Sequence, residues 1–225
     1  MQTILSYLSE LKQNNNRPWY HAHKEEYKTA NAAFLQIIQT LIFEIGQTDD
    51  SILHNDPKEV TFKLMRDTRF SHDKSPYRPA FRAHISSKGK LPIPVGYYLM
   101  IMPDNRSFLG GGLFADMFKD ATTMIRDYIT QNGEEWGALI SDTAFTKHFV
   151  VKGAALKNVP RGYDPLHPQA EFLKNKSWYL ECPVSDKQLT ADDFIPMATE
   201  AFIAMQPFNA FLNRALADFQ MPARP

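Results

Sequence analysis

Apolar residues recur at helical spacing over Ile4–Leu11 and predict a short amphipathic helix near the N-terminus. The polar run Asn14–Asn16 ends this helix and opens the next, because asparagine tolerates left-handed backbone and caps helices. A longer helix is predicted from Pro18 to about Ile45, since a proline costs little in a first helical turn. Its buried stripe comprises Phe34, Ile37, Ile38, Leu41, Ile42 and Ile45.

After residue 60 the hydrophobic period shortens from about 3.6 residues to 2, which is typical of strands with one buried face. We expect a strand over Val60–Leu64, with Phe62 in the buried row between these two residues. The same alternation predicts strands at 81–87, 97–102 and 107–114, and it allows one more at 177–182.

Two of these segments indicate how the sheet is arranged. In 81–87 the apolar residues alternate with polar ones, so Arg82 and His84 are expected on the face opposite to the apolar row. Residues 97–102 are apolar on both faces, which indicates a central strand. The turn at 103–106 returns the chain antiparallel to that strand.

The second half of the chain is predicted to be mainly helical. Helices at both ends of the chain then flank a mainly antiparallel sheet of about residues 60–114, which is an α+β fold. We expect one domain over residues 1–225, because no linker-like segment divides the chain. The helices are predicted at 115–131, at 134–141 and from 191 or 196 to 219, with a bend at Pro207.

Composition narrows the function classes without choosing one. Lys plus Arg and Asp plus Glu both number 25, so overall charge gives no reason to expect nucleic acid or a membrane as partner. The single cysteine, Cys182, excludes an intramolecular disulfide and a thiolate zinc site. The N-terminus does not resemble a secretory signal, and no helix pattern is apolar enough to span a membrane. We therefore expect a soluble, cytoplasmic protein.

Local charge is far from neutral between Lys58 and Lys90, where nine basic residues stand against three acidic ones. The densest part, RDTRFSHDKSPYRPAFR, spans Arg66–Arg82. Guanidinium groups suit phosphate and carboxylate ligands, and a nearby aspartate can fix an arginine in position. The segment predicts a site for a small anion, with four candidate ligands: Arg66, Arg69, Lys74 and Arg78.

A second interpretation of this segment stays open, because the same arginines can serve structural ion pairs with carboxylates elsewhere. The connection over 67–80 favours function, since it is too long for a simple turn and long ordered loops are more often functional. Phe70 and Tyr77 are expected to anchor this loop in the core rather than to act as stacking platforms.

Two further motifs have a structural and a functional interpretation. Gly110–Gly112 lies inside a predicted strand, where tight packing or a bulge is favoured over contact with a ligand. The segment PRGYDPLHP, Pro160–Pro168, contains Asp164 and His167. These two side chains are weak candidates for proton transfer, since the same residues also form turns and caps.

Motifs for metals and cofactors are missing from the sequence. His21 and His23 are spaced two apart on a predicted helix, so their side chains diverge and no metal site is predicted. The glycines match neither a phosphate-binding loop nor a dinucleotide fingerprint, and no nucleophile elbow is present. We expect no cofactor, and the sequence leaves open whether the protein is an enzyme.

Five segments together resemble a known family. They are NNNRPWY (14–20), RDTRFSHDKSPYR (66–78), GYYLMIMP (96–103), SFLGGGLF (107–114) and PRGYDPLHP (160–168). In this order they are similar to the family catalogued as domain of unknown function 2461. Tyr20 departs from the family pattern, which often has Phe there. The resemblance implies one full-length domain and brings no activity or catalytic residue.

The separated polar motifs have no evident packing role one by one, which suggests that they converge in space. Besides the four basic ligands, residues expected to line such a site are Asn16, Arg17, Trp19, Asp67, Asp73, Tyr77, Gly111, Arg161 and Tyr163.

Three functions fit this sequence. The favoured one is binding of a small phosphorylated or carboxylated ligand, with or without catalysis. A nucleic-acid-binding module on the same basic surface, with Phe70, Tyr77 and Tyr97 for stacking, is the less favoured alternative. A protein-interaction domain is the third. A deep pocket would favour the first, an open basic groove the second and a flat apolar patch the third. The sequence does not determine the oligomeric state.

Overall fold

In a computed structural model, which describes residues 1–114 and 118–222, four antiparallel strands form one sheet in the order β1-β2-β3-β4. These strands are β1 (Phe81–Ile85), β2 (Tyr97–Ile101), β3 (Ser107–Leu113) and β4 (Trp178–Val184). The predicted α+β class is confirmed, as are the central position of β2 and the additional strand near 177–182.

Helices lie on one face of this sheet and at both of its sides. They are α1 (Gln2–Gln13), α2 (Arg17–Ala22), α3 (Lys24–Gly46), η1 (Asp50–Ile52), α4 (Pro57–Val60), α5 (Lys119–Gln131), α6 (Gly133–Ser141), α7 (Thr143–Thr146), α8 (Ala170–Leu173), α9 (Asp186–Leu189) and α10 (Phe194–Ala215). Among the described residues, no helix is long and apolar enough to cross a lipid bilayer.

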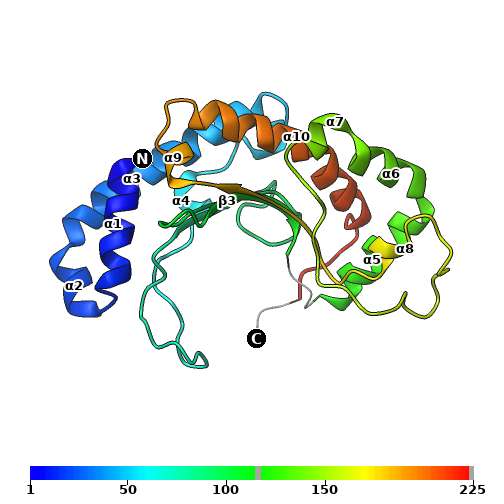
Figure 1. Ribbon diagram of the computed structural model, residues 1–225, viewed down its shortest axis with the longest axis horizontal. Helices are drawn as coiled ribbons and strands as arrows, with labels where there is room; N and C mark the ends of the chain where they lie inside the picture. The colour runs from blue at the N-terminus through cyan, green and yellow to red at the C-terminus, as the bar shows by residue number, and fades with distance from the viewer. Residues whose placement is uncertain (115–117, 223–225) are drawn as a thin grey trace.

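The described part of the chain forms an arch (Figure 1). Helices α3 and α10 cover the convex face of the sheet, and they pack on β1 and β3 respectively. Helices α1 and α2 form one side of the arch together with the loop 61–80, and helices α5 to α8 form the other side. The opposite face of the sheet, here called the concave face, looks into the hollow.

The core lies between the convex face of the sheet and the helices, as the helical stripe predicted. Phe34 of α3 stacks on Phe81 of β1 with ring centroids 5.2 Å apart, and both rings are buried. Most of the predicted stripe is buried, and Ile37 is partly buried. The long helix predicted from Pro18 to Ile45 is interrupted, because α2 ends at Ala22 and α3 begins at Lys24.

The predicted strand Val60–Leu64 is wrong. Pro57 occupies the first turn of α4 and the Asp56 side chain accepts a hydrogen bond from the Lys58 amide, so a helical turn extends through Val60. Among the described residues, this segment then makes one isolated bridge to the sheet, between Thr61 and Ala83, and a second bridge within the loop, between Met65 and Tyr77. Phe62 is therefore displaced from the predicted buried row and is only partly buried.

The glycines of β3 confirm the packing interpretation. A side chain on Gly111 would come within 2.5 Å of the Met205 sulfur on α10, so this glycine lets the helix approach the sheet. Asn209 fixes the contact, since its Oδ1 accepts from the Gly112 amide at 3.0 Å and its Nδ2 donates to the Gly96 carbonyl at 3.1 Å. Gly111 thus lies on the convex face.

The helices after the sheet begin and end near the predicted positions. Residues 115–117 of the predicted helix 115–131 lie outside the described residues, and α5 begins at Lys119. Helix α10 begins at Phe194, between the two predicted starts, and Pro207 lies inside it. On α5, the buried Arg126 donates to the carbonyls of Leu173 and Asn175, which ties the end of α8 to α5.

Candidate functional site

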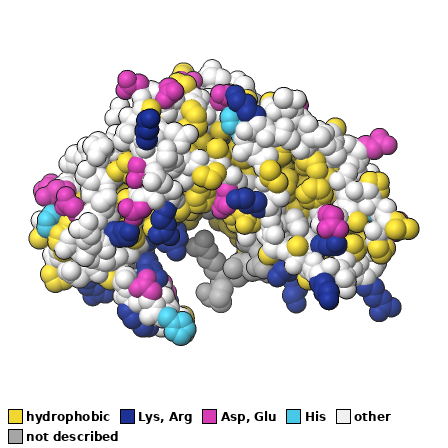
Figure 2. Space-filling view, in the orientation of Figure 1, with side chains coloured by type: hydrophobic (Ala, Val, Ile, Leu, Met, Phe, Trp, Pro, Cys, Tyr) yellow, Lys and Arg dark blue, Asp and Glu magenta, His cyan; other side chains and the backbone are white. Residues whose placement is uncertain are grey.

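Side chains on the concave face of the sheet form two cross-strand rows. In the first row, His84 of β1 faces Tyr98 of β2, and Gly110 and Glu181 continue it across β3 and β4. In the second row, Arg82 faces Met100, which is paired with Phe108. Figure 2 shows the hollow below these rows, with hydrophobic side chains at its roof and Lys and Arg side chains on the wall nearer α1.

Aromatic rings dominate this face. Tyr98 lies 5.6 Å from Phe108 and 6.4 Å from Phe62, measured between ring centroids. Phe114 continues the series, at 5.9 Å from Tyr98 and 4.7 Å from Tyr179, on which it stacks. All five rings are partly exposed, with Phe114 the most exposed at 41%. Exposed rings grouped in this way offer flat apolar surfaces to a ligand.

Gly110 explains how the rings lie over β3. A side chain at this position would come within 3.0 Å of the Phe114 ring and 3.2 Å of the Phe108 ring. Because glycine has no side chain, both rings cover the strand and border a cavity of about 400 Å³. That volume falls in the range of small-molecule sites. The cavity is also lined by Phe62, His84, Lys90, Pro92, Tyr98, Gly112 and Glu181.

Arg82 is the cation most integrated into this aromatic face. Its guanidinium lies 5.1 Å from the centre of the Phe62 ring, and one amino group donates to the Lys63 carbonyl at 3.3 Å. The Nε–H is buried and has no hydrogen-bond partner among the residues that the structure describes. Burial lowers the pKa of Arg82, the neighbouring Tyr98 hydroxyl opposes this shift, and the nearby charge of Arg78 adds to it. A buried donor without a partner costs free energy, which an acceptor placed beside it would offset.

His84 is buried at 8% exposure beside Arg82 and lines the cavity. Burial lowers its pKa to about 4, although hydrogen bonds to the backbone of Lys90 and Leu91 oppose the shift. The imidazole is therefore neutral at neutral pH. A neutral ring adds hydrogen-bonding capacity to the cavity without adding charge.

The acidic residue of the cavity is neutralised by a neighbour. Glu181 of β4 forms an ion pair with Lys152 at 2.9 Å, and the carboxylate raises the pKa of Lys152. Arg78 and Arg82 have no carboxylate partner among the described residues. The side of the concave face nearest the loop 61–80 therefore carries uncompensated positive charge.

The four predicted anion ligands do not all face the hollow as free cations. Arg66 forms an ion pair with Asp73, and Arg69 forms one with Asp67 at 2.6 Å. Lys74 donates to the Thr68 carbonyl at 3.0 Å. Arg66 and Arg69 thus form ion pairs, but with carboxylates of the loop itself and not with carboxylates elsewhere in the chain.

The carboxylates of the loop respond to these contacts. The pKa of Asp67 is lowered to about 2, chiefly by its hydrogen bond from the Arg69 side chain. The pKa of Asp73 is lowered more strongly, first by Ser75 and then by Arg66. The two carboxylate side chains are 60% and 59% exposed, so solvent screens the pairs and they hold the loop only weakly.

Of the three polar motifs expected to converge, the segment 14–20 and the segment 66–78 meet. The Asn15 side chain donates to the Tyr77 carbonyl at 2.8 Å and accepts from the Tyr77 amide at 3.0 Å. The Tyr77 ring is 3% exposed and stacks on Tyr20 at 4.2 Å, which confirms Tyr77 as an anchor. Phe70 is 95% exposed, so the prediction that it anchors the loop in the core is wrong.

The other residues of the segment 14–20 shape helix α2. Asn16 caps it by accepting from the Trp19 amide at 2.9 Å, and Trp19 stacks on His23 with centroids 4.0 Å apart. Arg17 is exposed in its first turn. These contacts hold the helix that carries Tyr20 against the loop.

The third motif lies at the other side of the arch, next to α5 and α6 (Figure 1). Tyr163 donates to Asp127 on α5 at 2.7 Å, and Arg161 is exposed. Asp164 accepts from the Leu166 amide, whereas His167 contacts the Thr130 carbonyl and the Gln169 amide. The Asp164 and His167 side chains thus serve turns, and no contact joins them to the loop 61–80.

No group of three or more His, Cys, Asp and Glu side chains within the described residues could hold a metal ion. The family model described as conserved hypothetical protein (DUF2461) matches residues 3–211. The chain belongs to this family. The match confirms the resemblance carried by the five sequence segments. The family's description names no activity. No curated protein and no solved structure shows significant similarity to the chain.

Several residues of the concave face were missed as ligand candidates, and the sequence carries a signal for only two of them. The alternation in β1 places Arg82 and His84 away from the core, and two polar residues on one face of a strand are worth noting. Phe108 and Tyr98 carry no such signal, because partly exposed aromatic residues look like core residues in a sequence.

Proposed function

We propose that the concave face binds a small phosphorylated or carboxylated ligand that also carries a flat ring. The observation that supports this most directly is the Arg82 guanidinium, which is half-buried among aromatic rings and keeps a buried, unpartnered Nε–H. An anionic oxygen at this position would supply the missing acceptor and the missing counter-charge. In this proposal the anion lies at Arg82, deeper in the hollow than a site formed only by the cations of the loop 61–80 would be.

The surroundings of Arg82 fit a ligand of mixed character. A ring would lie on Tyr98, Phe108 or Phe114, which border the cavity of about 400 Å³. Arg78, whose charge lies near Arg82, adds a second cation that has no carboxylate partner among the described residues. Lys74, Arg66 and Arg69 border the same side and would contribute long-range attraction while they stay paired within the loop.

Calorimetric titration with adenosine monophosphate, uridine monophosphate and inorganic phosphate tests this function. We expect both nucleotides to bind saturably and inorganic phosphate to bind more weakly, because phosphate lacks the ring. Arg82→Gln should weaken nucleotide binding by about tenfold or more, because it removes a charge-assisted hydrogen bond. Arg106→Gln removes an exposed arginine from the turn between β2 and β3 and serves as the matched control.

The loop provides the contrasting variant. Arg69→Gln changes an exposed arginine that is paired with Asp67, so we expect binding to change by less than about threefold. If Arg69→Gln weakens binding more than Arg82→Gln does, the anion site is the loop and not the concave face. Absence of saturable binding of either nucleotide and of inorganic phosphate would refute anion binding altogether.

Single-stranded nucleic acid is the second candidate, and the extent of the aromatic series favours it. Rings from the segment before β1, from β2, from β3 and from β4 follow one another across the open face. Successive bases stack on such rings in proteins that bind single strands without sequence preference. For this function, an oligothymidylate should bind far more tightly than the mononucleotides.

The salt dependence of oligonucleotide binding separates the two functions. If about four cations engage phosphates, the log-log slope of affinity against salt concentration should be about −3. A slope near zero, with mononucleotide and oligonucleotide affinities alike, would leave only the small ligand.

We infer a cytoplasmic location for this binding activity. The support is the use of a single cysteine, Cys182, which fits a reducing compartment. Fractionation of cells that express the tagged chain tests this, and recovery with secreted or membrane fractions would contradict it.

A further inference from the structure

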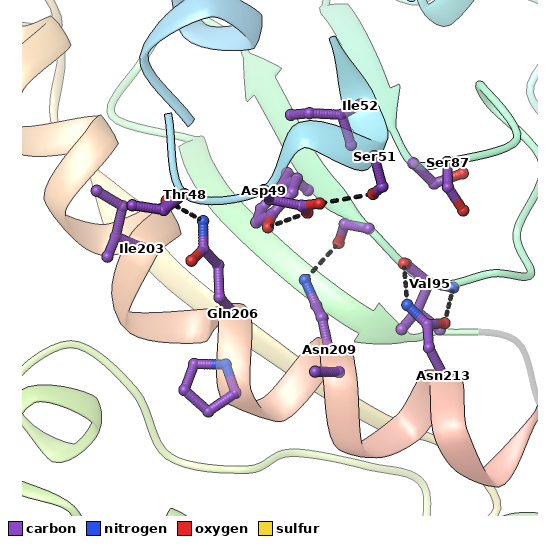
Figure 3. Close-up of a pocket in the computed structure, with 15 residues that line it drawn as sticks. Thr48, Asp49, Ser51, Ile52, Ser87, Val95, Ile203, Gln206, Asn209 and Asn213 are labelled. Carbon is purple, nitrogen blue, oxygen red and sulfur yellow. Dashed lines mark hydrogen bonds between the residues drawn. The ribbon is translucent and has the colours of Figure 1, made fainter. Parts of the chain in front are cut away.

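A second cavity, of about 530 Å³, lies on the convex side of the sheet at the end of β1 and the start of β2. Figure 3 shows side chains of α10 projecting from successive turns toward the segment after α3 and toward the start of β2. The sheet separates this cavity from the concave face, and the two share no lining residue.

One carboxylate, that of Asp49, lies in the wall of this cavity. Its Oδ2 accepts a hydrogen bond from the Tyr97 hydroxyl at 2.7 Å, and its Oδ1 accepts from the Ser51 hydroxyl at 2.6 Å. Each carboxylate oxygen has two acceptor sites, so one on each oxygen is left for a further donor. Burial and the carboxylate raise the pKa of Tyr97 well above its ordinary value, so the phenol stays a donor.

No positive charge balances Asp49. The carboxylate forms no ion pair with any described residue, and the cavity lining contains no Lys, Arg or His. A partly buried carboxylate that is held by two neutral donors favours a cation as its further partner. The cavity therefore selects against anions, in contrast to the concave face.

The rest of the wall is polar on one side and fixed in position. Asn213 holds α10 to β2 through the amide and the carbonyl of Val95, and the Gln206 side-chain amide donates to the Thr48 hydroxyl at 2.7 Å. Among the residues that the structure describes, the Gln206 side-chain carbonyl and the Ser87 hydroxyl have no such bond, so they can contact a ligand. Ile52, Ile203 and Pro207 supply apolar surface opposite these groups.

We propose that this cavity is a binding site for a small primary amine that also carries hydroxyl groups. The ammonium group binds to Asp49, which supplies the counter-charge and two free acceptor sites. Hydroxyl groups of the ligand bind to Gln206 and Ser87, which supply both donors and acceptors. Its carbon skeleton packs on the isoleucines. This site is independent of the function proposed for the concave face.

Glucosamine and glucose form a matched pair of probes, because they share the ring and the other hydroxyl groups and differ in one ammonium group. Heteronuclear NMR titration should show saturable shifts of the amides of Ser51, Ser87 and Tyr97 with glucosamine. Glucose should bind at least about tenfold more weakly than glucosamine, because it lacks the charge. Equal binding of both sugars would overturn the role of Asp49 as counter-ion.

Two variants locate the site. Asp49→Asn keeps an acceptor for the Tyr97 hydroxyl and removes the charge, so glucosamine binding should fall to the level of glucose. Asp50→Asn removes the same charge from the neighbouring exposed residue, outside the cavity lining, and should leave glucosamine binding unchanged. An unchanged affinity in Asp49→Asn would refute the proposal.

A third variant covers the case in which Asp49→Asn does not fold. Ala210 is an exposed residue of α10 that lines the cavity, so Ala210→Leu should block glucosamine while the protein stays folded. Arg82→Gln should bind glucosamine like the unchanged protein. Lack of saturable glucosamine shifts in the unchanged protein, or full binding in Ala210→Leu, would overturn the site.

Discussion

Single residues on the concave face carry charge and polarity into an environment that water only partly reaches. Arg82 and His84 are neighbours on β1 in the same face, and burial lowers the pKa of each. The two respond differently. Arginine stays charged because its ordinary pKa is far above neutrality, whereas histidine becomes a neutral group. One strand thus presents a permanent cation and a neutral hydrogen-bonding ring to the concave face, and the ring lines the cavity there.

The neutral state of His84 makes stability depend on pH. Its pKa is about 4 in the folded chain against an ordinary 6.5. Between these values the unfolded chain binds more protons, so the free energy of unfolding falls as the pH drops, by up to about 3 kcal/mol. In His84→Gln this part of the decrease should be absent. Urea denaturation at several pH values from about 7 to 4 measures it.

His72→Gln, a change of an exposed loop histidine, controls for the loss of a ring from the surface. The prediction fails if His84→Gln and the unchanged protein lose stability in parallel over this pH range. NMR titration of the imidazole gives an independent readout, since the His84 resonance should stay that of a neutral ring to about pH 4.

Phe62 and Phe202 distinguish an aromatic residue of the concave face from a core one. Phe202 of α10 is fully buried, and Phe202→Ala should lower the free energy of unfolding by about 3–5 kcal/mol through lost burial and a cavity. Phe62 is partly exposed beneath Arg82, so Phe62→Ala should cost about 1 kcal/mol, near the centre of measured point mutations.

The two variants should therefore separate in a denaturant titration, with the midpoint lowered mainly in Phe202→Ala. Phe62→Ala should instead weaken nucleotide binding. A loss of stability in Phe62→Ala as large as that in Phe202→Ala would show that this ring is a core residue, as the alternating pattern predicted.

At the scale of elements, the loop 61–80 depends on contacts with helices at the N-terminus. The Asn15 side chain satisfies both backbone groups of Tyr77, and Tyr20 covers its ring. The ion pairs inside the loop are exposed and hold it weakly. The amide group of Asn15 is therefore the stronger of the two attachments.

Asn15→Ala should detach the base of this loop. It leaves two backbone groups of Tyr77 without partners, at a cost of about 1–3 kcal/mol in the free energy of unfolding. Hydrogen exchange of the Tyr77 amide should accelerate in the variant. Asn14→Ala removes an exposed bond to the Glu10 carbonyl in the same turn and should change neither quantity much. Equal exchange in both variants would contradict the attachment.

The sequence could predict elements whose pattern is local, and it failed where the outcome depended on distant parts. The periods of 3.6 and 2 located α3 and β2 because their apolar faces repeat over several turns or residues. The 60–64 segment alternates equally well, but Asp56 and Pro57 begin a helical turn before it. Here the local start signal outweighed the alternation.

The candidate site was harder to predict than the fold. Charge counting located the basic segment, and the pairing of Arg66 and Arg69 with Asp73 and Asp67 depends on a loop conformation that no pattern encodes. The Asn209 bonds that fix α10 to two strands join residues about a hundred positions apart. Such contacts become visible only when the layers are assembled.

At the scale of the whole molecule, the arch depends on the close approach of α10 to β3. Gly112 has a backbone φ of +83°, and a side chain there would come within 2.4 Å of the Trp178 carbonyl. Gly162 also has a positive φ, at +99°, but a side chain added there would meet no atom within 4 Å. Substitutions at these two glycines therefore separate the cost of backbone strain from the cost of a clash between layers.

Gly162→Ala should cost about 1 kcal/mol, because only the strained backbone conformation is affected. Gly112→Ala adds overpacking against β4 and α10 and should cost about 3 kcal/mol or more. For a chain of this size, that corresponds to a fall in Tm of about 2–4 °C for Gly162→Ala and about 6–12 °C for Gly112→Ala. Scanning calorimetry measures both, and equal Tm values would show that β4 can move aside.

The sheet joins neighbours in sequence on one side and distant segments on the other. Strands β1, β2 and β3 follow one another through short connections, whereas β4 returns only after all of residues 114–177. Closing a longer loop costs more entropy, so the three-stranded part should form before β4 docks. In pulse-labelling experiments during refolding, amides of β2 should gain protection earlier than those of β4. The concave face, which needs Glu181 and Tyr179 from β4, is then completed last, and a newly made chain acquires the proposed binding surface only at the end of folding.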